Sequence, residues 1–205
     1  MSKHVYINKK LVYLGDCVVE QKEEPDKYHA KIRLCDSPED PHCDTDDIIY
    51  FGNSKYYKTD DEIENLYTEH GKCIDDFDNF TSFVEALNKS TEYKYYIVYS
   101  YIHSGVWLTL EHPTCRWDGG VFAIAQVKRR DTEKETDEAF KQDFKQMQAW
   151  YEGSVYYIGI YDELNEFVDN IGLFYGDEEL KKYIENMDTY YGITREEYLE
   201  AYNNR

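Results

Sequence analysis

The sequence has few of the residues and motifs that mark several large classes of protein. Its four prolines and 11 glycines are too few for a collagen-like or low-complexity chain. No apolar run approaches the roughly 18–20 residues that a bilayer span needs, and the first 13 residues lack the apolar core of a signal peptide. Cations are also scarce, with 23 Lys+Arg against 42 Asp+Glu and a formal net charge of −19. We therefore expect a cytoplasmic chain that binds neither nucleic acid nor membranes directly.

Motifs for nucleotide binding and for serine nucleophiles are missing too. Neither G-x-x-x-x-G-K-[ST] nor G-x-G-x-x-G occurs, and no serine lies in a G-x-S-x-G elbow. The five cysteines are irregularly spaced, which in a cytosolic chain indicates reduced thiols. They are Cys17, Cys35, Cys43, Cys73 and Cys115. We expect no cofactor.

Aromatic residues, in contrast, are abundant. They make up 17% of the chain and include 22 tyrosines. Because large rings bury enough apolar area to offset the conformational entropy of the chain, this composition favours a folded protein over an acidic disordered tail.

Hydrophobic periodicity predicts the elements of secondary structure. Apolar runs and alternating patterns predict strands at 11–19, 28–35, 48–51, 94–102, 106–111, 120–128 and 154–161. The segment 94–102 is apolar on both faces, as a central strand requires. Capping boxes and helical spacing predict helices that begin after Thr59, Asn79, Thr132 and Thr194, and another that begins near Asp177. The longest helix should cover about 133–152, with a stripe of Phe140, Phe144, Met147 and Tyr151.

Together these elements predict an α+β fold. The expected core is an antiparallel sheet of four or more strands, with 94–102, 106–111, 120–128 and 154–161 in one sheet that helices cover on one face. Residues 1–90 form an acidic N-terminal region with short strands and two helices, and residues 91–205 form the α+β core. One continuous domain is the alternative.

One candidate for chemistry is the region from His103 to Asp118. His103, Ser104 and Gly105, with His112, Cys115, Trp117 and Asp118, contain the types of residue that build a thiol nucleophile with its base and orienting carboxylate. However, a six-residue strand separates His103 from Cys115 by roughly 20 Å. The simpler interpretation is a turn, a tryptophan that closes the sheet and an Asp-Gly turn.

A metal site is a second candidate. His29, Cys35, His42 and Cys43 are ligand types that zinc prefers, but their spacing lacks the usual C-x2–4-C or H-x3–5-H pairs. No calcium-loop pattern occurs either. We therefore expect no metal.

The surplus of carboxylates is the third candidate. Carboxylates at i, i+3 or i+4 on a helix lie about 5–6 Å apart, comparable with the spacing of phosphates along a nucleic-acid strand. Interleaved lysines weaken this pattern in several helices. The expected partner-binding residues are Asp36, Glu39, Asp40, Asp44, Asp46, Asp47, Asp60, Asp61, Glu64, Asp75, Asp76 and Asp78. The alternative is a solvated acidic binding module whose charge serves only solubility.

Three motifs follow one another between residues 95 and 175. They are an aromatic strand ending in His103-Ser104-Gly105, then Cys115-Arg116-Trp117-Asp118-Gly119-Gly120, and later Gly153-Ser154-Val155-Tyr156. In this pattern the segment resembles a family of uncharacterised proteins carried by phages and mobile elements. Gly119 stands where the family often has serine. The resemblance implies no catalytic residues. It implies a genomic setting in which small acidic proteins block host defence, as antirestriction and anti-CRISPR proteins do.

These observations lead to one hypothesis and two alternatives. We expect a non-enzymatic inhibitor in the host cytoplasm that occupies the basic cleft of a nucleic-acid-binding host protein by mimicking DNA or RNA. A small hydrolase or nuclease that uses His103 to Asp118 is one alternative, and the solvated acidic module is the other. The sequence leaves open whether the chain forms a homodimer.

Overall fold

The computed structural model describes residues 9–14, 17–22, 27–41, 47–53, 55, 61–102, 105–114 and 119–205. Two compact units make up the chain. Unit 1 comprises Met1–Arg33, Tyr157–Gly172 and Lys181–Arg205, and unit 2 comprises Leu34–Tyr156 and Leu173–Leu180. Each unit draws on both halves of the sequence, so this division does not follow the boundary near residue 90 that composition suggested.

Near the N-terminus of the chain, strands β1 (Lys9–Leu14) and β2 (Cys17–Lys22) pair in an antiparallel ladder. Leu14 pairs with Cys17 and Val12 with Val19. The expectation of one strand over 11–19 is therefore wrong. Gly15 and Asp16, which separate the two strands in the sequence, lie outside the described residues.

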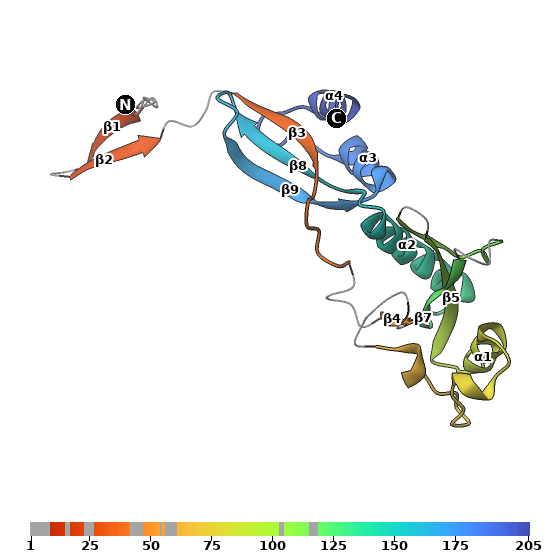
Figure 1. Cartoon of the computed structure of the whole chain (residues 1–205). Helices are drawn as coiled ribbons and strands as arrows, with labels where there is room; N and C mark the ends of the chain where they lie inside the picture. The colour runs from red at the N-terminus through yellow and green to blue at the C-terminus, as the bar shows by residue number, and fades with distance from the viewer. Residues whose placement is uncertain are drawn as a thin grey trace. The chain divides into compact units, whose positions relative to one another are not determined.

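Unit 2 contains a four-stranded antiparallel sheet, which confirms the predicted α+β class (Figure 1). Its strand order is β4-β7-β5-β6, with β5 and β7 in the centre, as expected for the segment 94–102. The strands are β4 (Ile48–Gly52), β5 (Tyr93–Ile102), β6 (Val106–Thr109) and β7 (Gly119–Lys128). The fourth place is taken by β4 rather than by the predicted strand at 154–161, because β4 pairs with the outer edge of β7.

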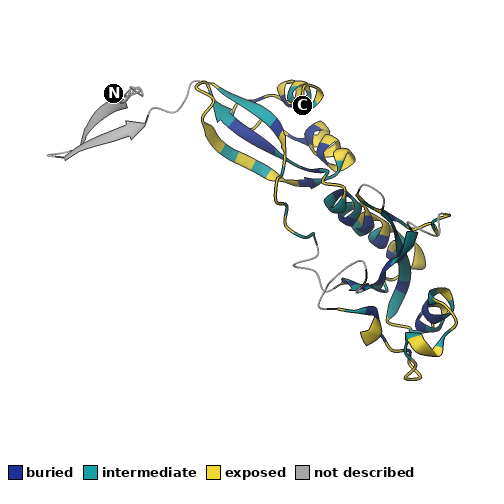
Figure 2. Cartoon of the chain, viewed as in Figure 1, coloured by how far each residue is buried: buried dark blue, intermediate teal, exposed yellow. Residues whose placement is uncertain are grey.

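Both faces of this sheet are covered, which corrects the expectation of one covered face. Helix α2 (Glu133–Tyr151) packs Phe140 and Met147 on the side of β5 and β7 that carries Val98. Helix α1 (Phe80–Leu87) packs on the other side, against Tyr95. Figure 2 colours buried positions on both α1 and α2 dark blue. The alternation of side chains along a strand produces these two apolar faces.

The caps predicted for several helices are present. Thr132 accepts a hydrogen bond from the Glu135 amide, and the Glu135 side chain accepts one from the Thr132 amide, so the predicted box begins α2. Asn79 caps α1, and Thr194 caps α4 (Arg195–Asn203). Helix α3 (Asp177–Asn186) begins where the sequence predicts it.

The helix predicted after Thr59 is not formed in the described part of this segment. Only a 3-10 turn, η1 (Ile63–Asn65), is present, and a second turn, η2 (Ile74–Asp76), follows it. Thr59 lies outside the described residues. Glu62 adopts an extended conformation because it bridges to Gly52 at the end of β4, and this tertiary contact replaces a helical start.

Unit 1 is built on a three-stranded sheet in the order β3-β8-β9. Its strands are β3 (Tyr28–Leu34), β8 (Val155–Asp162) and β9 (Phe167–Tyr175), and the last was not predicted. Helices α3 and α4 lie on the same side of this sheet in Figure 1. The fully buried side chains of the unit include Ile158 and Ile160 of β8, Ile184 of α3 and Tyr198 of α4. Among the described residues, no helix combines the length and apolar character needed to cross a bilayer.

A glycine in β8 makes room for an aromatic ring in unit 1. A Cβ atom added at Gly159 would lie 2.8 Å from Tyr161 Cε2. We expect Gly159→Ala to destabilise the protein by about 1–3 kcal/mol, because the ring must leave its contacts with His29 and Phe167. Urea denaturation measures this loss. In a Tyr161→Ala background the same substitution should cost clearly less, and an equal cost in both backgrounds would contradict the steric explanation.

Candidate functional site

The acidic segment from Asp61 to Asn79 packs on the α1 face of the unit 2 sheet. The Gly52 amide donates to the Asp61 carbonyl over 2.7 Å, which joins the start of the segment to β4. Ile63 and Leu66 are buried against the α1 core, and Phe77 packs on Phe83 in a tilted arrangement with ring centroids 5.3 Å apart. These apolar contacts anchor the segment, so its polar side chains project from a packed backbone.

The carboxylates that the sequence analysis singled out in this segment are exposed. We call the set the 61–78 acidic surface, and it consists of Asp61, Glu64, Asp75, Asp76 and Asp78. Asp76 has a structural role, because its carboxylate accepts a hydrogen bond from the Cys73 amide over 2.9 Å. Glu64, Asp75 and Asp78 form no ion pair with the part of the chain that the structure describes. Lys72 is the one lysine or arginine in this stretch of sequence. Negative charge therefore accumulates here.

The predicted residues from the 36–47 loop lie elsewhere in unit 2. Asp36 and Glu39 are exposed, and the loop is held where Trp150 Nε1 donates to the Pro38 carbonyl over 3.1 Å. Tyr175 donates to the Glu39 carbonyl over 2.9 Å. Asp40, which is half-buried, follows in the same loop.

Asp47 is separated from the 61–78 acidic surface by the length of β4. Its carbonyl accepts a hydrogen bond from the Lys128 amide at the start of β4, whereas Asp61 is bound at the other end. A strand of five residues spans about 17 Å. The described members of the predicted site therefore do not form one continuous patch. Asp44, Asp46 and Asp60 lie outside the described residues.

Other carboxylates are neutralised by cations, and the sequence analysis did not identify this network. Lys94 Nζ lies 2.5 Å from Asp137 Oδ1 and 2.7 Å from Glu133 Oε2, and Arg129 also pairs with Glu133. Tyr96 donates to Asp137 over 2.5 Å. Burial opposes the charge of Lys94, but hydrogen bonds to Asp137 and Glu133 still raise its pKa. These contacts join β5 to the first turns of α2.

The same network predicts a pH dependence of stability. Hydrogen bonds from Lys94 lower the pKa of Asp137 from 3.8 and of Glu133 from 4.5, and the pKa of Lys94 is raised from 10.5. A carboxyl group whose pKa is lowered by folding stabilises the fold when the pH is above its pKa in the unfolded chain. This stabilisation is lost as the pH falls through its pKa in the folded protein. A lysine whose pKa is raised by folding stabilises the fold when the pH is below 10.5, its ordinary pKa. This stabilisation is lost as the pH rises through its pKa in the folded protein.

We therefore expect Lys94→Met to destabilise the protein most between pH 4.5 and 10.5, the ordinary pKa values of glutamate and lysine. The difference in the free energy of unfolding between the variant and the wild-type protein should become smaller as the pH falls through the lowered pKa values of Asp137 and Glu133. Urea denaturation across this range measures it. Lys134→Met is the control, because Lys134 and its partner Glu138 are both largely exposed. A Lys94→Met effect that is constant with pH would contradict the role of the network.

The catalytic alternative rests mostly on residues outside the described ranges, namely His103, Ser104, Cys115, Trp117 and Asp118. His112 is described and exposed. Its Nδ1 lies 3.0 Å from the Pro113 carbonyl oxygen, and its ring packs on Tyr99 with centroids 5.1 Å apart. Because a carbonyl oxygen can only accept, Nδ1 carries the proton and donates this bond. The described contacts of His112 are therefore those of a surface loop.

The metal candidates are only partly described. His42 and Cys43 lie outside the described residues. His29 Nε2 lies 3.1 Å from Asn165 Oδ1, so this nitrogen already has a partner. Within the described ranges, no three side chains of His, Cys, Asp or Glu gather as a metal site.

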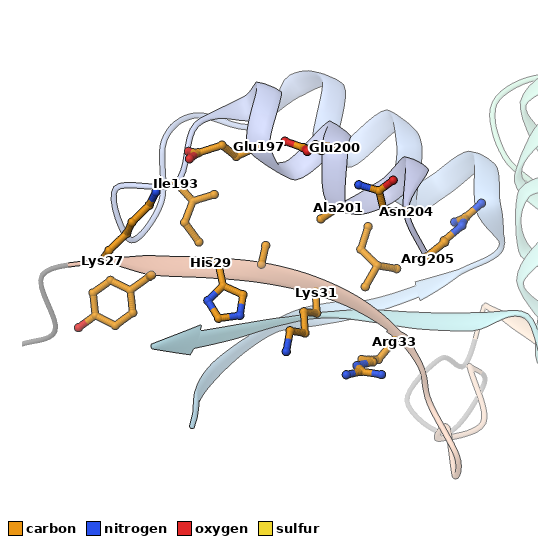
Figure 3. A pocket seen from close by; sticks show the side chains of 13 residues that line it. Lys27, His29, Lys31, Arg33, Ile193, Glu197, Glu200, Ala201, Asn204 and Arg205 are labelled. Atoms are coloured by element: carbon orange, nitrogen blue, oxygen red, sulfur yellow. The ribbon is translucent and has the colours of Figure 1, made fainter. Parts of the chain in front are cut away.

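A groove of about 580 Å³ lies in unit 1 between β3 and α4 (Figure 3). One wall is β3 with the preceding Lys27, and the other is formed by α4 and its flanking residues, including Ile193, Ala201 and Arg205. The sequence analysis did not identify this groove. The signal that could have found part of it is the alternation of Lys27, His29, Lys31 and Arg33 along a predicted strand, in a chain with so few cations.

In comparisons with known proteins, no family model, curated protein or solved structure matches the chain. The functional argument therefore depends on the geometry and the charges of the chain itself.

Proposed function

We propose that this protein is a non-enzymatic inhibitor that binds a basic, nucleic-acid-binding protein of a host restriction or CRISPR system through its 61–78 acidic surface. Carboxylates presented to a basic cleft compete with the phosphates that normally occupy it, and complementary charge accelerates the encounter. The resemblance of residues 95–175 to proteins of phages and mobile elements supports the choice of partner.

The observation that carries this proposal is the difference between two groups of carboxylates in unit 2. Glu133 and Asp137 are paired with Lys94, so their charge is used within the fold. Glu64, Asp75 and Asp78 are exposed on an anchored segment and form no ion pair with the described residues. Charges held on a packed frame lose little conformational entropy on binding, which favours a docking surface over a generic solvated coat.

The test measures displacement of a labelled DNA duplex from a purified restriction enzyme and from a purified CRISPR effector by fluorescence anisotropy. The wild-type protein should displace DNA from at least one of them, and its affinity should fall as salt rises from about 50 to 500 mM. A protein that displaces DNA from neither, or whose binding is insensitive to salt, would contradict the proposal.

A matched pair of variants tests which carboxylates act. The variant Glu64→Gln, Asp75→Asn, Asp78→Asn should bind the DNA-binding protein of the displacement assay on the order of tenfold more weakly than the wild type does, because three charges that face its basic cleft are removed. Asp76 is left unchanged because it caps the Cys73 turn. The control Glu163→Gln, Glu166→Gln, Asp188→Asn removes the same charge from exposed positions of unit 1 and should bind as the wild type does. Equal losses in both variants would indicate that net charge alone matters.

A further inference from the structure

Strand β3 is at the edge of its sheet, with β8 on one side only. The Cys35 amide donates to the Val155 carbonyl over 2.8 Å just beyond one end, and His29 stacks on Tyr161 near the other. β3 and β8 therefore run antiparallel, and residues with odd numbers on β3 direct their backbone groups toward β8. The N–H and C=O groups of Tyr28, Ala30 and Ile32 then point to the outer edge. No hydrogen bond of these groups is present outside the ladder among the described residues.

The groove runs along this outer edge. Every residue from Lys27 to Arg33 lines it, although neighbouring side chains of a strand point to opposite faces. Only a groove beside the backbone can contact consecutive residues in this way. The α4 wall presents Glu197, Glu200, Ala201 and Asn204, which have the i, i+3, i+4, i+7 spacing of one helix face.

The two faces of β3 differ in charge. His29, Lys31 and Arg33 point away from α4 (Figure 3), and Lys31 Nζ lies 4.7 Å from the centroid of the Tyr161 ring. The opposite side of the groove has small or apolar residues at Ala30, Ile193 and Ala201, beside the carboxylates of α4. A strand added to β3 would therefore place every second side chain beside cations. The others would face the α4 wall, where Ala201 and Ile193 are uncharged and Glu197 and Glu200 would repel acidic side chains.

This pattern favours an acidic peptide over a second copy of the chain. If two β3 strands paired antiparallel about Ala30, His29 would lie opposite Lys31, and Arg33 of each copy would lie on the same face as these residues. Like charges directly opposite each other destabilise a strand pair, and lysines on an edge strand oppose self-association. Carboxylates at alternate positions of a different peptide would reverse the sign of these contacts.

We propose that the outer edge of β3 binds an extended acidic peptide segment by strand addition. The backbone of the peptide pairs with Tyr28, Ala30 and Ile32, its carboxylates lie beside Lys31 and Arg33, and its alternate uncharged side chains face Ala201 and Ile193. This site is in unit 1, uses different residues from the 61–78 acidic surface, and does not depend on the function proposed above.

The test uses a fluorescein-labelled peptide, Thr-Glu-Val-Glu-Val-Glu-Thr, with the full chain in an anisotropy titration. The same peptide with lysine in place of each glutamate, and one with proline in place of the central glutamate, are the ligand controls. The acidic peptide should bind at least tenfold more tightly than either, because one control reverses the charges and the other removes a backbone donor. Similar affinities for the acidic and the basic peptide would overturn the proposal.

Two variants of the protein separate the backbone contribution from the charge contribution. Ala30→Pro removes one outward-facing donor, does not remove a bond to β8, and should abolish binding with an unchanged circular dichroism spectrum. Lys31→Glu with Arg33→Glu should reverse the preference in favour of the basic peptide, and it keeps the test decisive if Ala30→Pro does not fold. Retention of the acidic preference in the reversed variant would overturn the proposal.

Two further measurements separate this site from the other occupant and from the proposed function. If sedimentation shows a dimer that Ala30→Pro converts to a monomer, a second copy occupies the edge and the peptide proposal is wrong. The variant Glu64→Gln, Asp75→Asn, Asp78→Asn should bind the acidic peptide as the wild type does. Failure of the peptide test then leaves the DNA displacement test unaffected, and the reverse is also true.

Discussion

Replacing Phe140 with alanine should lower the free energy of unfolding by about 3–5 kcal/mol, the usual cost of deleting a buried aromatic ring. Phe140 is 1% exposed and lies in the core between α2 and the unit 2 sheet. Its ring stacks on Tyr96 with centroids 3.9 Å apart. The loss combines the transfer free energy of the ring with the cavity that remains, and it also removes a stacked aromatic pair.

Urea denaturation followed by circular dichroism measures this change. Gln142→Ala is the matched control, because Gln142 is an exposed residue on the same helix and its replacement should change stability by no more than about 0.5 kcal/mol. A loss below about 1 kcal/mol for Phe140→Ala would show that the packing of α2 on the sheet is not as described.

The second large effect is expected in unit 1, at Tyr198. This side chain is fully buried on α4, and its hydroxyl donates to the Tyr190 carbonyl over 3.2 Å. Tyr198→Ala should cost about 3–5 kcal/mol, whereas Tyr198→Phe should cost about 0.5–1.5 kcal/mol because it removes only the hydrogen bond. If the two variants were equally stable, the burial of the ring would be contradicted.

Tyr198 also gives a distinct response to alkaline pH. Burial, with smaller contributions from Tyr183, Tyr190 and Glu197, raises the pKa of its phenol from 10.0 to about 12. The raised pKa stabilises the folded state below pH 10, and this contribution is lost as the pH rises from 10 to about 12. The wild-type protein should therefore lose more stability than Tyr198→Phe across this interval, as measured by denaturation at a series of pH values.

The sequence predicted the helices well where local chemistry was sufficient. The α2 capping box and the stripe of Phe140, Phe144 and Met147 are local features, and the structure confirms the helix. The prediction of a helix after Thr59 was wrong because a non-local contact competes with helix formation. Glu62 bridges to Gly52 in β4, and this pairing depends on residues that helical periodicity does not consider.

Strand partners were harder to predict than strands. The segment 154–161 was expected in the sheet of β5 and β7. It forms β8, which pairs instead with β3 and β9. Both sheets accept an antiparallel apolar strand, so the pattern of one segment does not specify which sheet it joins. Strand β9 was missed because its sequence, FVDNIGLFY, does not alternate between apolar and polar residues as a half-buried strand does.

The candidate site was predictable only in part. Charge counting identified Glu64, Asp75 and Asp78, and the structure finds them exposed on a common segment. Counting could not separate these from Glu133 and Asp137, because pairing with Lys94 depends on how β5 and α2 pack. The groove beside β3 was missed for the same reason, since its second wall comes from the far end of the chain.

The pairing of β3 with β8 has a consequence for the synthesis of this protein. Lys31 of β3 donates a hydrogen bond to Asn165, which lies between β8 and β9, and the two residues are 134 positions apart in the chain. At a translation rate of about 5–20 residues per second, β3 leaves the ribosome roughly 7–27 s before its partner strand exists. During that interval β3 has two unpaired edges, and Lys31 and Arg33 lower the tendency of this exposed nascent segment to aggregate.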